Sequence, residues 1–349
     1  MSISTAKRDY WPTGEWQTAD PGSVGMLPDK LLELDKALRS QYRSINGIVI
    51  IRKGYMVLEK YNNGFGPDDT HNVTSVTKSV TSALIGIAID AGYIKSIDQK
   101  VLDFFPEYIA GDRDIQKRAT TIRHLLTMTA PYAWGKSGAM GNEPLDRLRR
   151  QRNWVSYILD LLGRNGQLGT FNYSSAGPHL LSAIITHTTG MCAREFANKY
   201  LFKPLGMKEI PDHKMRSFSL DNVFGKNITG WIKDPSGITT GGWGLTMTPR
   251  DMARFGFLYL NRGIWDNKQI ISETWIDEST ALNTNEYGYL WWLKGQDRTF
   301  AFSALGYGGN CIYCIPEKDL VVAIASRMAA KPRDRWWLLE RCIIPSLTD

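Results

Sequence analysis

The stretch "NVTSVTKSVTSALIGIAID", residues 72–90, opens with polar residues and continues as an apolar run. Its apolar positions recur at helical spacing, which predicts a helix buried in the core. These positions include Val80, Ala83, Leu84, Ile87 and Ala88. Ser75 and Lys78 lie three positions apart at the start of this helix, so we expect their side chains on one face and within reach of each other.

A serine paired with a lysine in this way is a candidate nucleophile. The hydroxyl is a poor nucleophile until another group accepts its proton, and a lysine can do so only when burial or nearby positive charge lowers its pKa. The start of a helix also offers unpaired N–H groups, which favour negative charge developing nearby. The four-residue pattern S-x-x-K also occurs by chance, so other residues have to support it.

Strand and helix patterns follow a definite order along the chain. An amphipathic helix is predicted over residues 28–42, and "INGIVIIRKG" and "YMVLEKYNNG" then form a hairpin around Lys53-Gly54. From residue 75 to about 215 the periodicity is mainly helical. Four strand-like stretches follow, namely "EYGYLWWLKG", "RTFAFSALGYGG", "NCIYCIPE" and "DLVVAIASR", before a last helical stretch, "RDRWWLLERCIIPSL".

This order predicts an α+β fold in which one antiparallel sheet is built from both ends of the chain and flanked by helices. We expect an N-terminal extension at residues 1–20, an α/β domain formed by residues 21–80 and 235–349, and a mainly helical inserted domain at residues 81–234. The active site is expected between the two domains.

The composition is that of an ordinary globular protein, with 43% hydrophobic and 22% charged residues among 349. The start, "MSISTAKRDYWPTGEW", has no apolar run suited to a secretory signal, and no segment approaches the roughly 20 apolar residues of a spanning helix. We therefore expect a soluble, cytoplasmic protein with no membrane partner. The net charge of +7 is spread out, so no nucleic-acid partner is expected, and the cluster "RLRRQR" at residues 147–152 is interpreted as a solvated helix face or, alternatively, a patch for an acidic partner or substrate.

Cysteine and histidine residues give no signature of a metal or redox site. Cys311 and Cys314 lie on a predicted strand, where residues three apart face opposite sides, so we expect buried free thiols. G-x-S-x-G, H-E-x-x-H, P-loop and strand-borne G-x-G-x-x-G patterns are absent. The histidines are scattered and are expected to be structural: His71, His124, His179, His187 and His213.

Two further stretches can support the serine and lysine. In "FNYSSAGPHLL", Tyr173 and Ser175 precede a helical run and can place a phenol and a hydroxyl in one cleft, or form an ordinary turn. In "ALGYGGNCIYCIPE", Gly306, Gly308 and Gly309 interrupt a strand, which allows close approach of a ligand and a backbone N–H opposite the serine, or marks a β-bulge.

In this order and at these separations the three elements resemble the serine β-lactamase, penicillin-binding protein and class C-like esterase superfamily, over roughly residues 20–345. The likeness includes "TIRHLLTMT", "FKPLGM" and "GGWGLTMTPRDMARFGFLYLNRG". It implies a β-lactamase/transpeptidase-like fold with Ser75 as the acylated nucleophile, Lys78 as its proton acceptor and Tyr173 as a proton relay. It also implies an oxyanion hole formed by the backbone N–H groups of Ser75 and Tyr307, and no metal or organic cofactor.

Departures from the family pattern narrow the expected substrate. The third motif, usually Lys-Thr-Gly, is here Ala304-Leu305-Gly306, which lacks the cation that helps to hold a substrate carboxylate. Ser175 stands where class C enzymes have asparagine, and the E-x-x-L-N segment of class A enzymes is not found. Tyr-x-Ser-Ala and x-x-Gly-Tyr-Gly-Gly look closer to the 6-aminohexanoate-dimer hydrolase and carboxylesterase branch, which handles small linear amides and esters.

We therefore expect a serine hydrolase that cleaves a small-molecule ester or linear amide through an acyl-enzyme. Ser175 and Gly306 are expected to contact the substrate. Aromatic side chains can line an acyl pocket or belong to the core; the candidates are Trp134, Trp243, Tyr287 and Trp291. Two alternatives stay open: a β-lactamase or D,D-peptidase, expected to be weak without the third-motif cation, and a catalytically weak binding or sensor domain.

Overall fold

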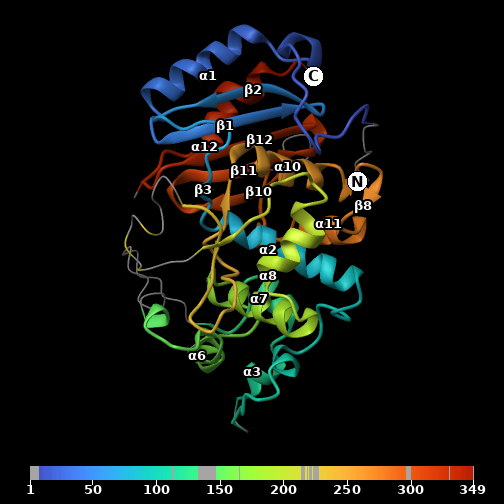
Figure 1. The fold of residues 1–349 in the computed structure, drawn as a ribbon, viewed down its shortest axis with the longest axis vertical. Helices are drawn as coiled ribbons and strands as arrows, with labels where there is room; N and C mark the ends of the chain where they lie inside the picture. Colours follow the sequence, from blue (N-terminus) through green and yellow to red (C-terminus); the bar gives the residue numbers. More distant parts are fainter. Residues whose placement is uncertain are drawn as a thin grey trace.

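A six-stranded antiparallel sheet dominates one end of the computed structural model (Figure 1). In spatial order its strands are β2 (Tyr55–Tyr61), β1 (Ile45–Arg52), β12 (Leu320–Ser326), β11 (Asn310–Ile315), β10 (Ala301–Gly306) and β9 (Trp292–Lys294). Both ends of the chain thus contribute to one sheet, and the predicted α+β architecture is confirmed. The structure describes residues 8–111, 114–132, 147–164, 166–213, 217, 219, 222, 228–295, 300–329 and 331–348.

Helices cover both faces of this sheet. Along β1, Ile48 and Ile50 belong to one hydrophobic cluster, and Val49 and Ile51 belong to another, because successive side chains of a strand point to opposite faces. The first face packs against α1 (Pro28–Ser40), α12 (Arg335–Leu338), the π-helical turn η7 (Leu339–Ile343) and the 3₁₀ turn η8 (Ile344–Ser346). The second face packs against α10 (Pro249–Leu260) and, near β10 and β11, against α2 (Val76–Asp90).

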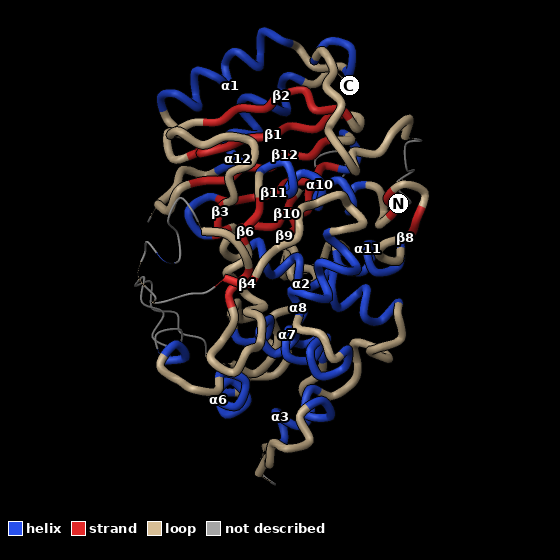
Figure 2. Tube along the Cα trace, in the orientation of Figure 1, coloured by secondary structure: helices blue, strands red, loops and turns tan. Residues whose placement is uncertain are grey.

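The other end of the molecule is mainly helical (Figure 2). Its helical elements are η2 (Val101–Phe104), α3 (Ile115–Ala119), α4 (Ile122–Leu126), α6 (Trp154–Leu161), α7 (Ala176–Thr189), α8 (Ala193–Ala197) and the π-helical turn η3 (Asn198–Phe202). Short strands pair as β3 (His71–Asn72) with β6 (Thr246–Met247), β4 (Asp212–His213) with β5 (Trp231–Ile232), and β7 (Ile264–Trp265) with β8 (Lys268–Gln269). The remaining elements are η1 (Pro21–Val24), α11 (Glu273–Ser279), η5 (Tyr307–Gly309) and η6 (Pro316–Lys318). Across the described ranges, none of the helices is both long and apolar enough to cross a bilayer.

One strand prediction was largely wrong. Of "EYGYLWWLKG", only Trp292–Lys294 forms a strand. Leu290 adopts a left-handed backbone conformation with φ of +60°. Its N–H donates to Leu126 O, and its own carbonyl accepts a hydrogen bond from Ser79 Oγ. The residues around Leu290 are therefore tied to α4 and α2, and pairing with β10 begins only at Trp292.

The predicted free thiols are confirmed. Cys311 and Cys314 are unpaired and buried on β11. They belong to the two different hydrophobic clusters, on opposite faces of the sheet.

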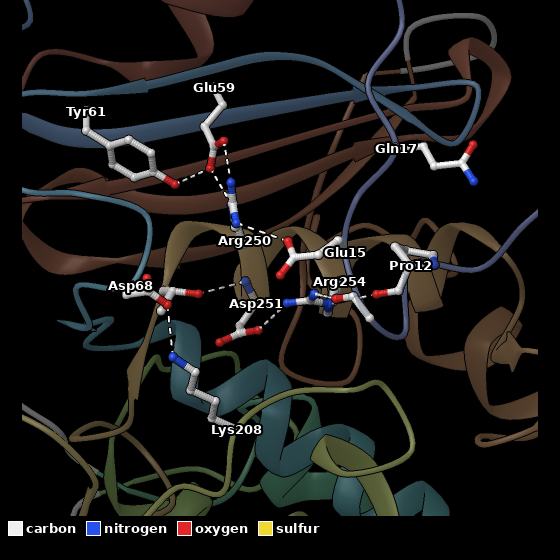
Figure 3. A network of polar contacts seen from close by, with 12 residues as sticks. Pro12, Glu15, Gln17, Glu59, Tyr61, Asp68, Lys208, Arg250, Asp251 and Arg254 are labelled. Atoms are coloured by element: carbon white, nitrogen blue, oxygen red, sulfur yellow. Dashed lines mark hydrogen bonds and ion pairs between the residues drawn. The ribbon is translucent and has the colours of Figure 1, made fainter.

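The described part of the predicted N-terminal extension, residues 8–20, runs across α10. Arg254 on α10 donates to Pro12 O at 3.0 Å and to Gly14 O at 2.6 Å (Figure 3). The same guanidinium donates to Asp251 Oδ1 at 2.7 Å, one turn earlier on the helix. A buried arginine thus fixes this segment to the helix that covers the sheet.

The domain boundaries placed at residues 80 and 235 stay predictions, and α2 continues through the first of them.

Candidate active site

Ser75 lies at the start of α2 and is partly exposed to solvent. Of residues 71–88, all described, Ser75 alone is not buried. The preceding residue, Thr74, has a φ of +52°, which is a strained conformation for a β-branched residue. Its N–H donates to Asn72 Oδ1 at 2.9 Å, and its hydroxyl lies 2.8 Å from Val73 O. These contacts hold the turn that presents the serine.

Lys78 Nζ lies in the middle of a group of oxygen atoms. It is 3.0 Å from Ser75 Oγ, 3.1 Å from Ser175 Oγ and 2.8 Å from Gly242 O. The three partners come from the start of α2, the start of α7 and the loop before β6, and no carboxylate is among them. The side chain is 1% exposed, and this burial lowers the pKa of Lys78 to about 7. A substantial fraction of the amine is therefore unprotonated near neutral pH.

Tyr173 lies beside both Ser75 and Lys78, with Lys78 Nζ 4.9 Å from the centroid of its ring, and is held by aromatic neighbours. Its ring stacks on Trp292 with 5.4 Å between centroids and meets Tyr287 edge-on at 6.1 Å. Burial raises the pKa of Tyr173 to about 12, although its hydrogen bond with Ser75 lowers it in part. Lys78 and Tyr173 thus have pKa values shifted in opposite directions, one toward a free base and the other toward a protonated acid.

The end of β10 packs directly against the turn before the serine. A Cβ atom on Gly306 would lie 2.3 Å from both Thr74 Oγ1 and Val73 O, so only glycine fits here. Thr74 Oγ1 is also 3.3 Å from Tyr307 O, which places Tyr307 beside the segment that carries Ser75. The glycines of this stretch form neither a continuous strand nor a bulge. Gly306 ends β10, whereas Gly308 and Gly309 lie in the 3₁₀ turn η5, with φ of +84° at Gly308.

The loop that supplies the Gly242 carbonyl is anchored to α7. Asp234 Oδ2 lies 3.2 Å from the buried His179 Nε2, and Asp234 Oδ1 accepts hydrogen bonds from two backbone N–H groups farther along the loop. A Cβ on Gly241 would lie 1.8 Å from Pro178 O, so the backbone approaches α7 very closely. His179 is thus a structural residue, in agreement with the prediction for the histidines.

The structure therefore brings together Ser75, Lys78, Tyr173 and Ser175. The hydroxyl of Ser175 contacts the lysine, and its expected contact with the substrate stays a prediction. Trp243 follows Gly242 and stacks on Trp154 at 6.2 Å.

Two aromatic candidates turn out to be core residues, and a third cannot be placed. Trp291 is fully buried against Phe255 and Tyr259, and Tyr287 is 2% exposed, so the core alternative is correct for both. Trp134 lies outside the described residues.

Sequence reasoning missed two residues of this site, Gly242 and Trp292. The glycine pair in "TTGGWG" is a signal for close backbone approach that could have drawn attention to Gly242. No comparable signal separates Trp292 from its buried neighbour Trp291.

Comparisons with known proteins identify relatives of the whole chain. The chain is 23% identical over 365 residues to the 6-aminohexanoate-dimer hydrolase of Paenarthrobacter ureafaciens, with 95% of this chain and 86% of that protein covered. A solved structure of a putative 6-aminohexanoate-dimer hydrolase from Bacillus anthracis superposes with a TM-score of 0.72 at 19% identity, covering 98% of this chain and 88% of that one. A family VIII carboxylesterase structure superposes with a TM-score of 0.64 at 16% identity, covering 93% and 98%.

These likenesses confirm the β-lactamase/transpeptidase-like fold and the predicted resemblance. A family model described as "Beta-lactamase" matches residues 35–341. The relatives of this chain include a hydrolase. Since the family match spans most of the chain, the protein belongs to the β-lactamase family.

Proposed function

We propose that the protein is a serine hydrolase that cleaves small esters or linear amides through an acyl-enzyme on Ser75. The observation that carries this proposal is the contact between Ser75 Oγ and Lys78 Nζ at 3.0 Å, made by an amine whose pKa is lowered to about 7. A neutral amine at this distance can accept the hydroxyl proton as the oxygen attacks a carbonyl.

In the acylation step, Ser75 Oγ bonds to the substrate carbonyl carbon while its proton passes to Lys78 Nζ. The backbone N–H groups of Ser75 and Tyr307 stabilise the resulting oxyanion. As the bond to the alcohol or amine breaks, Tyr173 gives its proton to the leaving group and is reprotonated from Lys78. A water molecule then attacks the acyl carbon and gives its proton to Lys78; the bond between the acyl carbon and Ser75 Oγ breaks, and Ser75 Oγ takes that proton as the carboxylic acid is released.

The polarity of the expected substrate follows from the residues around Ser75. The Tyr173 and Trp292 rings offer an apolar surface next to the nucleophile, which suits an aliphatic acyl chain. The third-motif strand offers no cation, because Ala304 is buried and uncharged. The names of the hydrolase relative and the carboxylesterase neighbour support the same substrate class.

Replacing the nucleophile tests this proposal. Ser75→Ala should lower hydrolysis of p-nitrophenyl butyrate on the order of 10³-fold or more, because the acyl-enzyme can no longer form. Ser96→Ala, which removes an exposed serine away from the site, is the matched control. Mass spectrometry should find the acyl group, or a fluorophosphonate label, on the peptide that contains Ser75. Full activity of Ser75→Ala would overturn the proposal.

The same assays separate the alternatives. Rapid turnover of nitrocefin, or a lasting adduct with a fluorescent penicillin, would favour a β-lactamase or D,D-peptidase. Failure of wild-type protein to take up the fluorophosphonate label would favour a binding or sensor domain.

A further inference from the structure

Two turns of the chain carry the proposed oxyanion N–H groups, one before Ser75 and the other at η5 with Tyr307. Both N–H groups have to point at one oxygen atom, so the separation of the two turns matters. The η5 turn has little rigidity of its own, because Gly308 and Gly309 adopt φ of +84° and +92° and the side chain of Tyr307 is 39% exposed. Hydrogen bonds to its main chain therefore have to hold it in place.

Asn310 follows η5 directly and contacts both turns. Its side chain is buried, with 3% exposed. Its Nδ2 donates to Tyr307 O at 3.0 Å and lies 3.5 Å from Asn72 O in the turn before the serine. Asn72 Oδ1 in turn accepts from the Thr74 N–H at 2.9 Å. A carboxamide nitrogen has two N–H bonds, so one side chain can serve both carbonyls.

The strand β12 fixes which way this amide points. Asn310 Oδ1 accepts from the Ser326 N–H at 2.9 Å. A backbone N–H can only donate and a carbonyl can only accept, so Oδ1 has to face Ser326 and Nδ2 has to face Tyr307. Thr74 Oγ1 lies 3.3 Å from the same carbonyl, but it has one hydrogen to give and is nearer to Val73 O, at 2.8 Å. Tyr307 O therefore depends mainly on Asn310.

Separate contacts hold the far end of η5. Gly309 O accepts from Ser326 Oγ at 3.1 Å and from Arg335 Nε at 3.3 Å. Arg335 is 4% exposed and also donates to Ser326 Oγ, at 3.2 Å. Loss of the Asn310 amide should therefore free the Tyr307 end of the turn while the Gly309 end stays attached to β12.

We infer that Asn310 is a positioning residue for the oxyanion hole. By holding Tyr307 O and Asn72 O with one amide, it sets the separation of the backbone N–H groups of Ser75 and Tyr307. The inference rests on the proposed function and extends it to a side chain that acts through other groups. Because those groups bind the oxyanion, loss of the amide should weaken binding of the tetrahedral transition state more than binding of the substrate.

Two substitutions test the inference. Asn310→Asp keeps the size of the side chain and the acceptor for the Ser326 N–H but removes the amide donor. Its kcat for p-nitrophenyl butyrate should fall about 10- to 100-fold with KM unchanged, less than the roughly 10²- to 10³-fold loss expected when an oxyanion donor is removed outright. The Ki of butylboronic acid, whose tetrahedral adduct on Ser75 Oγ resembles the oxyanion intermediate, should rise by the same factor. Asn310→Ala, which cannot regain a donor by protonation, should show the same changes.

Asn261→Ala is the matched control. Asn261 is 2% exposed, and its amide donates to Phe257 O at 2.6 Å and accepts from Arg8 Nε at 2.6 Å, between α10 and the N-terminal segment. This variant can lower Tm but should keep the wild-type kcat and Ki.

Unchanged kcat and Ki in both Asn310 variants would overturn the inference. A fall in kcat with no rise in Ki would overturn it as well, because that is the result of a purely structural role. If the proposed function itself fails, hydrolysis by the wild-type protein will survive in Ser75→Ala, which distinguishes the two failures.

Discussion

At the scale of single residues, the three oxygen contacts of Lys78 fit an ammonium group that donates to all of them, and they also leave a place for the lone pair of the neutral amine. Such an amine has two N–H bonds and one lone pair. Gly242 O can only accept, so it takes one N–H at 2.8 Å, and Ser175 Oγ takes the other at 3.1 Å. The lone pair is then left for the hydroxyl of Ser75 at 3.0 Å. A protonated Lys78 has three N–H bonds and no lone pair, so it cannot accept the proton of Ser75.

The pH dependence of activity follows from this arrangement. Lys78 acts as a base only when it is unprotonated, so kcat/KM should fall as the pH drops below about 7, by about tenfold per pH unit. Ester hydrolysis measured from pH 5 to 9 should show this acid limb. Tyr173→Phe should lower the rate at every pH without moving the limb, since the pKa of about 12 lies outside this range. A flat profile across pH 6 to 8 would contradict the assignment of Lys78.

The same residues show what local sequence can predict about the site. Ser75 and Lys78 are neighbours on one helix, so their spacing alone brings them together. Gly242 lies 164 positions from Lys78, and only the packing of its loop against α7 places its carbonyl at the amine. Trp292 likewise reaches Tyr173 only through the fold, so periodicity in its own segment could not identify it.

At the scale of elements, prediction succeeded where burial is regular and failed where it is not. The strand β1 and the helix α2 have long apolar patterns, and both were predicted within a few residues of their observed bounds. The failure is "EYGYLWWLKG", of which only β9 forms a strand. The predicted helical stretch over residues 333–347 is confirmed over residues 335–346, although it passes from α12 to the π-helical η7 and the 3₁₀ turn η8, with Pro345 in the last. Proline cannot donate a backbone hydrogen bond, which accounts for the irregular end.

The contact between α10 and the N-terminal segment gives a prediction about stability. Arg254→Met leaves the Asp251 carboxylate buried without its cation and the Pro12 and Gly14 carbonyls without their donor (Figure 3). The free energy of unfolding in urea should fall by roughly 3 to 5 kcal/mol at pH 8. Burial already raises the pKa of Asp251. In the variant that carboxyl can protonate more readily, so the loss should shrink toward pH 5.

A second ion pair in the same view serves as the control. Lys208 and Asp68 are paired at 2.9 Å, but both side chains are more than 80% exposed. Lys208→Met should therefore leave the free energy of unfolding close to that of the wild-type protein, because solvent screens this ion pair. Equal losses in Arg254→Met and Lys208→Met would show that the buried arginine does not hold the N-terminal segment.

At the scale of the whole molecule, the sheet and the helices share one core. The larger hydrophobic cluster begins with Val49 and Ile51 on the inner face of the sheet and continues through α10 and α2 to α7 and α8. The three oxygen partners of Lys78 also come from separate parts of the chain, namely the start of α2, the start of α7 and the loop before β6. The predicted boundaries at residues 80 and 235 thus divide a continuous core, and assembly of the site depends on both parts.

This shared core predicts that the chain unfolds as one unit. Far-UV circular dichroism and tryptophan fluorescence should give coincident urea transitions for the full chain. A fragment of residues 81–234 should show little helix and no cooperative transition, because it exposes the apolar faces of α2 and α7 without α10 and the sheet to cover them. Two separated transitions in the full chain, or a fragment that melts cooperatively with native helix content, would instead establish the helical part as an independent domain.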